Sequence, residues 1–261
     1  MRKLLLSTVA AAAVVAAASA HAVPTLILSL TDTGTAGSTV SCSVTAGGLL
    51  PGCTSPSGAF TLGFANAFGA LEMTFQGAVG GYRLSFNTST SNTPGTAFEA
   101  TITNSYDNLR NVGSTGRLVV SMTAIDFSLP AGPALTLFGS QALSSNSNNV
   151  GTINSAFYAS EPNALNPSAA PSATTSCTLL AATAASCAAV PQNFTNINMF
   201  SLQDIMTFQL ALLQPGTNSP IQGSSNLVVR NRVPEPMTTA LVGLGLFGVA
   251  LFSRRRKATQ A

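Results

Sequence analysis

Short runs of alternating apolar and polar residues recur through most of this chain and are its most restrictive feature. Successive side chains of a β-strand point to opposite faces, so such runs predict strands with one buried face. Glycine, asparagine, serine and proline separate them at about the spacing of an all-β sandwich. The expected strands are residues 25–30, 38–45, 60–64, 71–75, 82–86, 98–103, 117–129, 134–138, 153–158, 206–213 and 226–230. We therefore expect an all-β fold, an antiparallel β-sandwich of jelly-roll-like type.

The two runs at 71–75 and 82–86 allow a register to be predicted, because a glycine-rich segment separates them and favours a hairpin. The register that puts every apolar residue on one face sets Phe75 opposite Tyr82, Met73 opposite Leu84 and Leu71 opposite Phe86. A slip of one residue would instead set Phe75 against Arg83, since the side-chain period of a strand is two.

Two later segments depart from simple alternation. Within 117–129 the apolar phase changes, which predicts a β-bulge near Ala124 and Ile125 that re-aims the strand. From 144 to 191, asparagine, serine, alanine and proline dominate, and the pattern weakens. We expect one or two strands there, around 153–158, followed by a long loop.

The first 22 residues read as a secretory signal peptide. Arg2 and Lys3 form a basic start, residues 4–18 are apolar, and small residues at Ala20 and Ala22 suit cleavage. Cleavage after Ala22 would leave residues 23–232 as an exported domain.

The C-terminal segment, residues 233–261, contains an apolar run followed by a basic end, which is the arrangement of a membrane-targeting signal. Residues 237–252 are uncharged and apolar, and as a helix they would span about 24 Å, short but usable against a hydrocarbon core of about 30 Å. Four cations follow it, at Arg254, Arg255, Arg256 and Lys257. By the positive-inside rule this tail stays in the cytoplasm and the domain lies across the membrane. The alternative is a buried C-terminal helix of a soluble domain, which has no reason to end in four cations.

A short proline-flanked motif precedes the apolar run: Val233, Pro234, Glu235 and Pro236. The prolines favour an extended, exposed strip at the membrane surface. Motif, short helix and basic end together resemble the PEP-CTERM sorting signal of Gram-negative bacteria. The resemblance implies recognition by an exosortase, a membrane transpeptidase, with removal of the helix. It also implies an inner-membrane intermediate, a final place at the cell surface or in the matrix, and an association with extracellular polysaccharide.

Charge and residue usage exclude several functions for the exported part. Residues 23–233 hold five Arg and seven acidic residues, a net charge of −2, so no basic surface favours nucleic acid. The single histidine, His21, and both lysines lie in the terminal signals. The exported domain therefore lacks the imidazole of a Ser-His-Asp or Cys-His site and the lysine of a Schiff base.

Four cysteines remain after export: Cys42, Cys53, Cys177 and Cys187. An even number in an exported chain favours disulfides, and three connectivities are possible. Pairing the neighbours in sequence, Cys42 with Cys53 and Cys177 with Cys187, requires no assumption about the fold. A metal site is disfavoured by the lack of C-x-x-C spacing and of histidine. A G-x-G-x-x-G match at 243–248 lies in the apolar run without a βαβ unit, so no cofactor is expected.

Three functions fit these features. The first is a structural or polysaccharide-associated protein of the surface or biofilm matrix, without catalysis. The second is a glycan-active enzyme that would need two carboxylates about 5–10 Å apart, drawn from Glu72, Glu99, Asp107 and Asp126. The third is a permanently tail-anchored periplasmic domain. It would be exported in the same way, but its C-terminal helix would not be removed.

Overall fold

The computed structural model describes most of residues 25–231. Its gaps are 35–37, 46, 52, 54, 56, 65–69, 94, 146–149, 161–162, 165–171, 181–182, 197–198 and 213–219. The expected signal peptide and the expected helix at 237–252 lie outside the described residues. Within the described part, no helix has the length and apolarity to cross a membrane.

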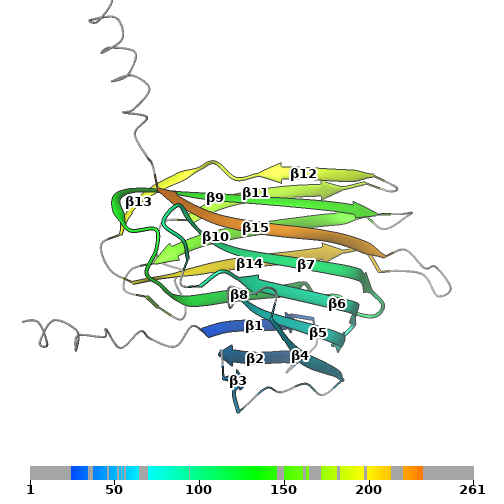
Figure 1. Ribbon diagram of the computed structural model, residues 1–261. Helices are drawn as coiled ribbons and strands as arrows, with labels where there is room; N and C mark the ends of the chain where they lie inside the picture. Colours follow the sequence, from blue (N-terminus) through cyan, green and yellow to red (C-terminus); the bar gives the residue numbers. More distant parts are fainter. Residues whose placement is uncertain are drawn as a thin grey trace, which may run out of the picture.

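All the described secondary structure is β, and it forms two antiparallel sheets (Figure 1). The first has seven strands in the order β11 (Ser172–Leu179), β10 (Gly151–Ser160), β14 (Phe200–Leu210), β8 (Leu118–Phe127), β1 (Thr25–Asp32), β2 (Thr39–Thr45) and β3 (Gly48–Leu49). The second has the order β12 (Ala184–Ala188), β9 (Gly132–Ser145), β15 (Ile221–Asn231), β7 (Glu99–Asn111), β6 (Tyr82–Ser91), β5 (Leu71–Val79) and β4 (Gly58–Phe64). A further strand, β13 (Gln192–Asn196), also pairs with β9. The all-β expectation is confirmed.

The apolar positions of both sheets meet in one core. In β1, Leu26, Leu28 and Leu30 are fully buried and alternate with partly exposed residues, as the sequence pattern predicts. Across the core, the ring of Tyr106 from β7 meets that of Phe208 from β14 edge to face, with centroids 5.0 Å apart. Each fully buried leucine or phenylalanine contributes about 1.5–3 kcal/mol, so this core is the main source of stability.

The expected register of the β5–β6 hairpin is wrong. The structure sets Val79 opposite Tyr82, so the turn is the tight Gly80–Gly81 pair, with Gly80 at φ 54°. A register shift between Phe75 and Gly77 then sets Phe75 opposite Asn87. The two-residue glycine turn fixes the pairing at its end, and the irregularity lets the strands keep their apolar residues inside despite it.

The expected bulge in β8 is confirmed, close to where the apolar phase changes. The pairing of β14 with β8 shifts between Phe200, opposite Phe127, and Leu202, opposite Ala124. Asp126 takes a positive φ of 71°, which places the extra residue at positions 125–126. The shift turns Phe127 into the core, where its ring stacks against Phe200 at 5.4 Å.

The expected long loop before residue 191 is wrong, because that segment contains β11 and β12, and β13 follows directly. In β11 the buried residues Ala173, Cys177 and Leu179 are separated by serine and threonine. Such a strand carries little apolar contrast between its faces, so its alternation is hard to see in the sequence.

The described chain begins and ends at the same end of the two sheets. Thr25 of β1 lies opposite Ile125 near the end of β8. A short connection leads from β8 to β9, whose Leu135 lies opposite Asn231, the last residue of β15. The first and last described residues therefore share one end, which we call the exit end.

Candidate functional site

The predicted sorting residues lie immediately beyond the last described strand. The motif residues Val233, Pro234, Glu235 and Pro236, the cations Arg254, Arg255, Arg256 and Lys257, and the cleavage residues Ala20 and Ala22 all fall outside the described residues. What the structure shows is how the domain holds the chain up to that point.

The β15 strand is fixed up to Asn231. It lies between β9 and β7, so both of its edges are paired. At its end Arg230 forms an ion pair with Glu99, Nε to Oε2 at 3.3 Å, and the Asn231 amide donates to the carbonyl of Phe98 at 3.3 Å. An exposed ion pair of this kind contributes at most about 1 kcal/mol to stability. The pairing of β15 with its two neighbouring strands is therefore what holds the end of this strand in place. The tail thus leaves from a central strand rather than from a frayed edge.

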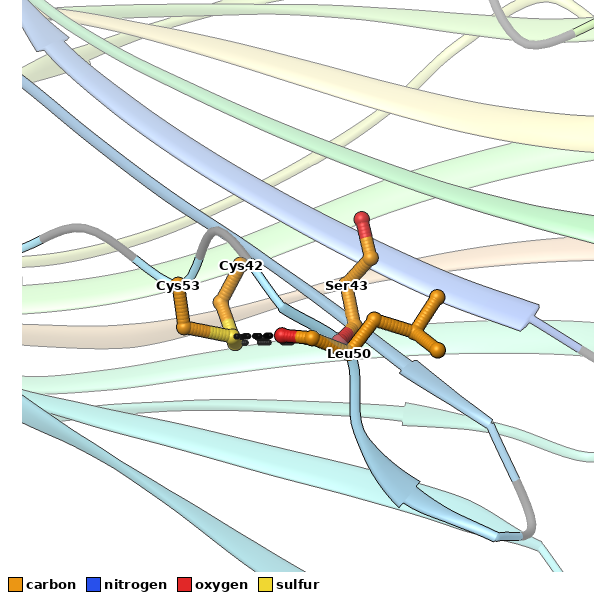
Figure 2. Close-up of a disulfide and its surroundings, with 4 residues drawn as sticks. All are labelled: Cys42, Ser43, Leu50 and Cys53. Atoms are coloured by element: carbon orange, nitrogen blue, oxygen red, sulfur yellow. Dashed lines mark hydrogen bonds between the residues drawn. A yellow bond between two sulfur atoms is a disulfide. The ribbon is translucent and has the colours of Figure 1, made fainter.

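The first disulfide joins Cys42 of β2 to Cys53, which follows β3 (Figure 2). The sulfur of Cys53 lies 3.4 Å from the carbonyl oxygen of Leu50, and Cys42 is buried in the core. Residues after Cys53 lead to β4 in the other sheet. The bond therefore pins the chain at the β3 edge, where it crosses from the first sheet to the second.

The second disulfide joins Cys177 of β11 to Cys187 of β12, with Cα atoms 5.9 Å apart. These two strands are the edges of different sheets at the side opposite β3 and β4. Both bonds join cysteines that are neighbours in sequence, and each lies where the chain passes between sheets. Together they fasten the two open edges of the domain.

Removing either disulfide should destabilise the exported protein by about 3 kcal/mol, because each bond closes a loop of 10 or 11 residues. The variants are the paired serine replacements Cys42→Ser with Cys53→Ser, and Cys177→Ser with Cys187→Ser, which leave no lone thiol. Urea unfolding would measure the change. Urea unfolding curves that superimpose on that of the parent would contradict the structural role given to the bonds.

The four acids considered for catalysis do not gather in a hollow of the described surface. Glu99 is paired with Arg230 at the exit end, and Asp126 is held in the bulge by Asn163, whose Nδ2 donates to its Oδ1 at 2.6 Å. Glu72 and Asp107 lie on the outer faces of β5 and β7. Four hollows of the described surface, which lie over β9, β10, β11 and the β5–β6 hairpin, have none of these acids in their lining.

Two buried acids that the sequence reasoning did not single out are Asp32 and Asp204. Asp204 is fully buried among apolar residues of β14, and burial raises its pKa to about 7, while the nearby hydroxyl of Ser225 lowers it only in part. Burial, and then the charge of Asp204, raise the pKa of Tyr106 above its ordinary value. Asp204 stands in phase with the apolar residues Leu202 and Met206, and this placement in the alternating pattern was the signal that could have marked the position.

The outer face of the second sheet is hydroxyl-rich. One row of cross-strand neighbours runs over β5, β6, β7, β15 and β9, and consists of Glu72, Thr90, Thr103, Asn226 and Ser140. Thr103 donates its hydroxyl to Asn226 Oδ1 at 3.3 Å. Neighbouring strands lie about 4.8 Å apart, so this row presents closely spaced hydrogen-bonding groups with one carboxylate.

Among the described residues, no three His, Cys, Asp or Glu side chains gather as a metal site. A comparison with curated proteins finds none that matches the chain. A family model described as the PEP-CTERM protein-sorting motif matches residues 232–257, which begin directly after β15. The C-terminal segment of this chain is therefore a PEP-CTERM sorting motif, which implies export, association with a membrane and exosortase sorting toward the cell surface.

Proposed function

We propose that this protein is a structural or polysaccharide-associated component of the cell surface or matrix, delivered through its C-terminal motif and without catalytic activity. In this proposal residues 1–22 are a cleaved signal peptide, residues 23–232 form a jelly-roll-like β-sandwich, and residues 233–261 are the sorting signal. The apolar segment 237–252 holds the protein in the inner membrane until an exosortase removes it.

The observation that carries this proposal is the sorting motif placed directly after a central, fully paired strand. Five residues separate Asn231 from the apolar run, and an extended chain of that length reaches about 20 Å. The folded domain would therefore stay close to the membrane surface until the tail is cut. Because β15 is held on both sides, cleavage beyond Asn231 would leave the fold intact.

The outer surface supports a role in a glycan-rich layer. The row from Glu72 to Ser140 presents hydroxyl and amide groups with little charge. Such groups hydrogen-bond sugar hydroxyls without a strong general attraction for ions. The two disulfides at the sheet edges suit a protein that works outside the cell.

Replacing Pro234, Glu235 and Pro236 with alanine should block sorting and leave folding unchanged, because the motif lies beyond the last strand. The protein is expected to accumulate in the membrane fraction at the mass of the form that keeps its tail. Intact mass and fractionation, in the producing host with and without its sorting enzyme, would measure this. The matched control is Pro191→Ala, in an exposed loop between β12 and β13.

Neutral replacements of Arg254, Arg255, Arg256 and Lys257 should instead weaken retention in the membrane before processing, because these cations hold the tail on the cytoplasmic side. If the motif variant is trimmed and released like the parent, the sorting proposal fails. If the parent itself keeps its tail at its final location, the protein is a permanently anchored domain.

A further inference from the structure

Three exposed apolar side chains lie at the exit end, where β1 begins and β15 ends, at the left of Figure 1. Phe98 directly precedes β7, Leu129 lies between β8 and β9, and Met199 directly precedes β14. Their exposed fractions are 74%, 38% and 41%, respectively. Single exposed apolar residues are common on any folded domain, so the informative feature is that these three share one end of the sheets.

The two loops that carry Phe98 and Leu129 both contact the last described residue, Asn231. Its backbone amide donates to the carbonyl of Phe98 at 3.3 Å, and its side-chain amide donates to the carbonyl of Ala131 at 3.4 Å. The loops also touch each other, because a Cβ at Gly95 would clash with the carbonyl oxygen of Leu129. The chain therefore leaves the domain beside these two loops.

Met199 lies next to the loop that carries Leu129. It precedes Phe200, whose register partner is Phe127. Met199 and Leu129 therefore continue the same pair of antiparallel strands past its end. We call Phe98, Leu129 and Met199 the apolar tips.

The loop that carries Phe98 satisfies much of its own backbone. The Thr96 hydroxyl accepts from the amides of Phe98 and Glu99, at 3.3 and 3.0 Å. The Thr96 amide in turn donates to the carbonyl of Glu99 at 2.8 Å. Polar groups that are already hydrogen-bonded lose little when water is removed, so this loop can enter a less polar medium as it stands.

The described parts of the two loops carry no charge. These parts are residues 92–93, 95–98 and 128–131, and they contain no acidic or basic residue. The charged groups next to them, Glu99 and Arg230, form an ion pair with each other. Moving a charge out of water is costly, so an uncharged surface can approach a bilayer more closely than a charged one.

We propose that the apolar tips insert into the lipid surface of the membrane that holds the tail. Five residues separate Asn231 from the apolar run at 237–252, so the exit end stays within about 20 Å of the bilayer. A short tether keeps the tips at an effective concentration in the millimolar range, so weak insertion is enough to hold them there. This inference rests on the proposed function, which places the tail in the membrane.

A lipid surface fits the apolar tips better than a second copy of the protein. A stable dimer buries about 800 Å² on each partner, with closely matched shapes. Three partly exposed side chains at loop ends supply only a fraction of that area. Lipid requires no matching shape, and apolar side chains at a protein surface enter the boundary between headgroups and acyl chains. Insertion would set the strands of both sheets on end, with the sorting motif at the bilayer surface.

Tryptophan fluorescence tests the insertion, because the chain contains no tryptophan. Phe98→Trp would be made in the exported protein that keeps its tail, purified from a host without the sorting enzyme. This protein would be reconstituted into vesicles of phosphatidylethanolamine and phosphatidylglycerol whose acyl chains carry bromine, a short-range quencher. Relative to vesicles without bromine, Phe98→Trp should lose about half or more of its emission, because its side chain would lie among the lipids.

Two control positions are exposed but lie away from the exit end. Val112, 46% exposed, follows the far end of β7, a strand of 13 residues that spans about 43 Å. Val190, 72% exposed, follows a residue that donates to Gly139, which lies about 23 Å along β9 from its start at Gly132. Val112→Trp and Val190→Trp should therefore keep their emission in brominated vesicles.

A further variant tests whether the three side chains act together. Leu129→Ser and Met199→Ser, added to Phe98→Trp, should reduce the quenching about twofold or more, because two of the inserted groups are lost. Thermal unfolding should show that each variant folds like the parent, since all the changed side chains are exposed.

Equal quenching at positions 98, 112 and 190, no quenching at position 98, or quenching that the two serines leave unchanged would overturn the proposal. A blue shift of the Phe98→Trp emission that depends on protein concentration rather than on bromine would assign the tips to a second copy. Quenching that appears only after the sorting enzyme is added would assign them to that enzyme.

Flotation of the vesicles separates this inference from the proposed function. Protein that does not float with the vesicles would reject the membrane tail, and with it both the proposed route and the insertion. Protein that floats while Phe98→Trp stays unquenched would reject the insertion alone.

Discussion

Replacing Asp204 with asparagine should raise the free energy of unfolding at pH 8 by up to about 4 kcal/mol. The carboxyl is fully buried, and burial raises its pKa from 3.8 to about 7. Each pKa unit corresponds to about 1.36 kcal/mol, and the shift is about three units. Asparagine has nearly the same shape and no charge, so the folded state no longer has to bury an ion or hold a proton against the solvent.

The sign of the pH dependence follows from proton binding. Between about pH 4 and pH 7 the unfolded chain has lost the Asp204 proton while the folded chain keeps it. Stability therefore falls as the pH rises through this window, and then levels off above about pH 7. At pH 4 the carboxyl of the unfolded chain is only about half ionised, so parent and Asp204→Asn should differ little in stability.

Urea unfolding of the exported, disulfide-bonded protein at pH 4 to 8 would measure this effect. The difference between parent and Asp204→Asn should grow with pH across the window. Asp107→Asn is the matched control, because it removes a carboxylate from the partly exposed face of β7 instead of from the core. Two curves that stay parallel from pH 4 to pH 8 would show that Asp204 is not held neutral in the fold.

Asp204 also illustrates how much of the fold could be predicted from the sequence alone. Alternation predicted the all-β class and most strands of the core, because a half-buried strand must place apolar residues at every second position. The strand β14 was expected to begin at residue 206, whereas it begins at Phe200. Asp204 broke the apolar pattern, and a carboxyl that stays neutral inside a core does not follow the usual rule for buried charge.

Register was less predictable than strand identity. The pairing of Phe75 with Asn87 depends on a two-residue glycine turn and a register shift, and several combinations of turn and shift keep the apolar residues inside. The disulfides show a similar limit. The short spacing favoured Cys177 with Cys187, but only the structure shows that this bond joins the edges of two sheets.

The functional features likewise differ in how far the sequence alone could predict them. The sorting motif is local in sequence, so its residues could be named from their order along the chain, and the family model matches the same segment. Pairs of residues that the fold creates are not local in sequence: Arg83 and Arg110, for example, are brought together by the pairing of β6 with β7. Sequence spacing does not reveal such a pair, because the register that unites them depends on irregular backbone on both sides.

Replacing Asp32 with alanine should lower the free energy of unfolding by about 4 kcal/mol. The carboxylate, at the end of β1, is buried and accepts from the backbone amides of Gly34 and Gly81, both at 2.8 Å. It also accepts from the hydroxyl of Ser114 at 2.5 Å. Hydrogen bonds to a charged group contribute about 1.5–3 kcal/mol each, and their loss leaves buried donors without an acceptor.

These contacts join three segments that are distant in sequence. Gly34 follows β1, Gly81 forms the β5–β6 turn, and Ser114 precedes β8, so one carboxylate holds one end of both sheets together. The backbone is tight here, because a Cβ at Gly80 would lie 2.3 Å from Asp32 Oδ2. Burial and then the charge of Asp32 raise the pKa of Tyr82 to about 12, which provides a second signal of the same contact.

Urea unfolding at pH 7 would measure the loss, with Asp107→Ala as the control for removing a partly exposed carboxylate. Asp32→Asn should be intermediate, because one amide oxygen can still accept while the amide nitrogen faces a donor. Spectrophotometric titration of Asp32→Asn should show the Tyr82 phenol ionising at lower pH than in the parent, since the neighbouring negative charge is gone. A loss in Asp32→Ala no greater than in Asp107→Ala would mean that the three segments are held together without this carboxylate.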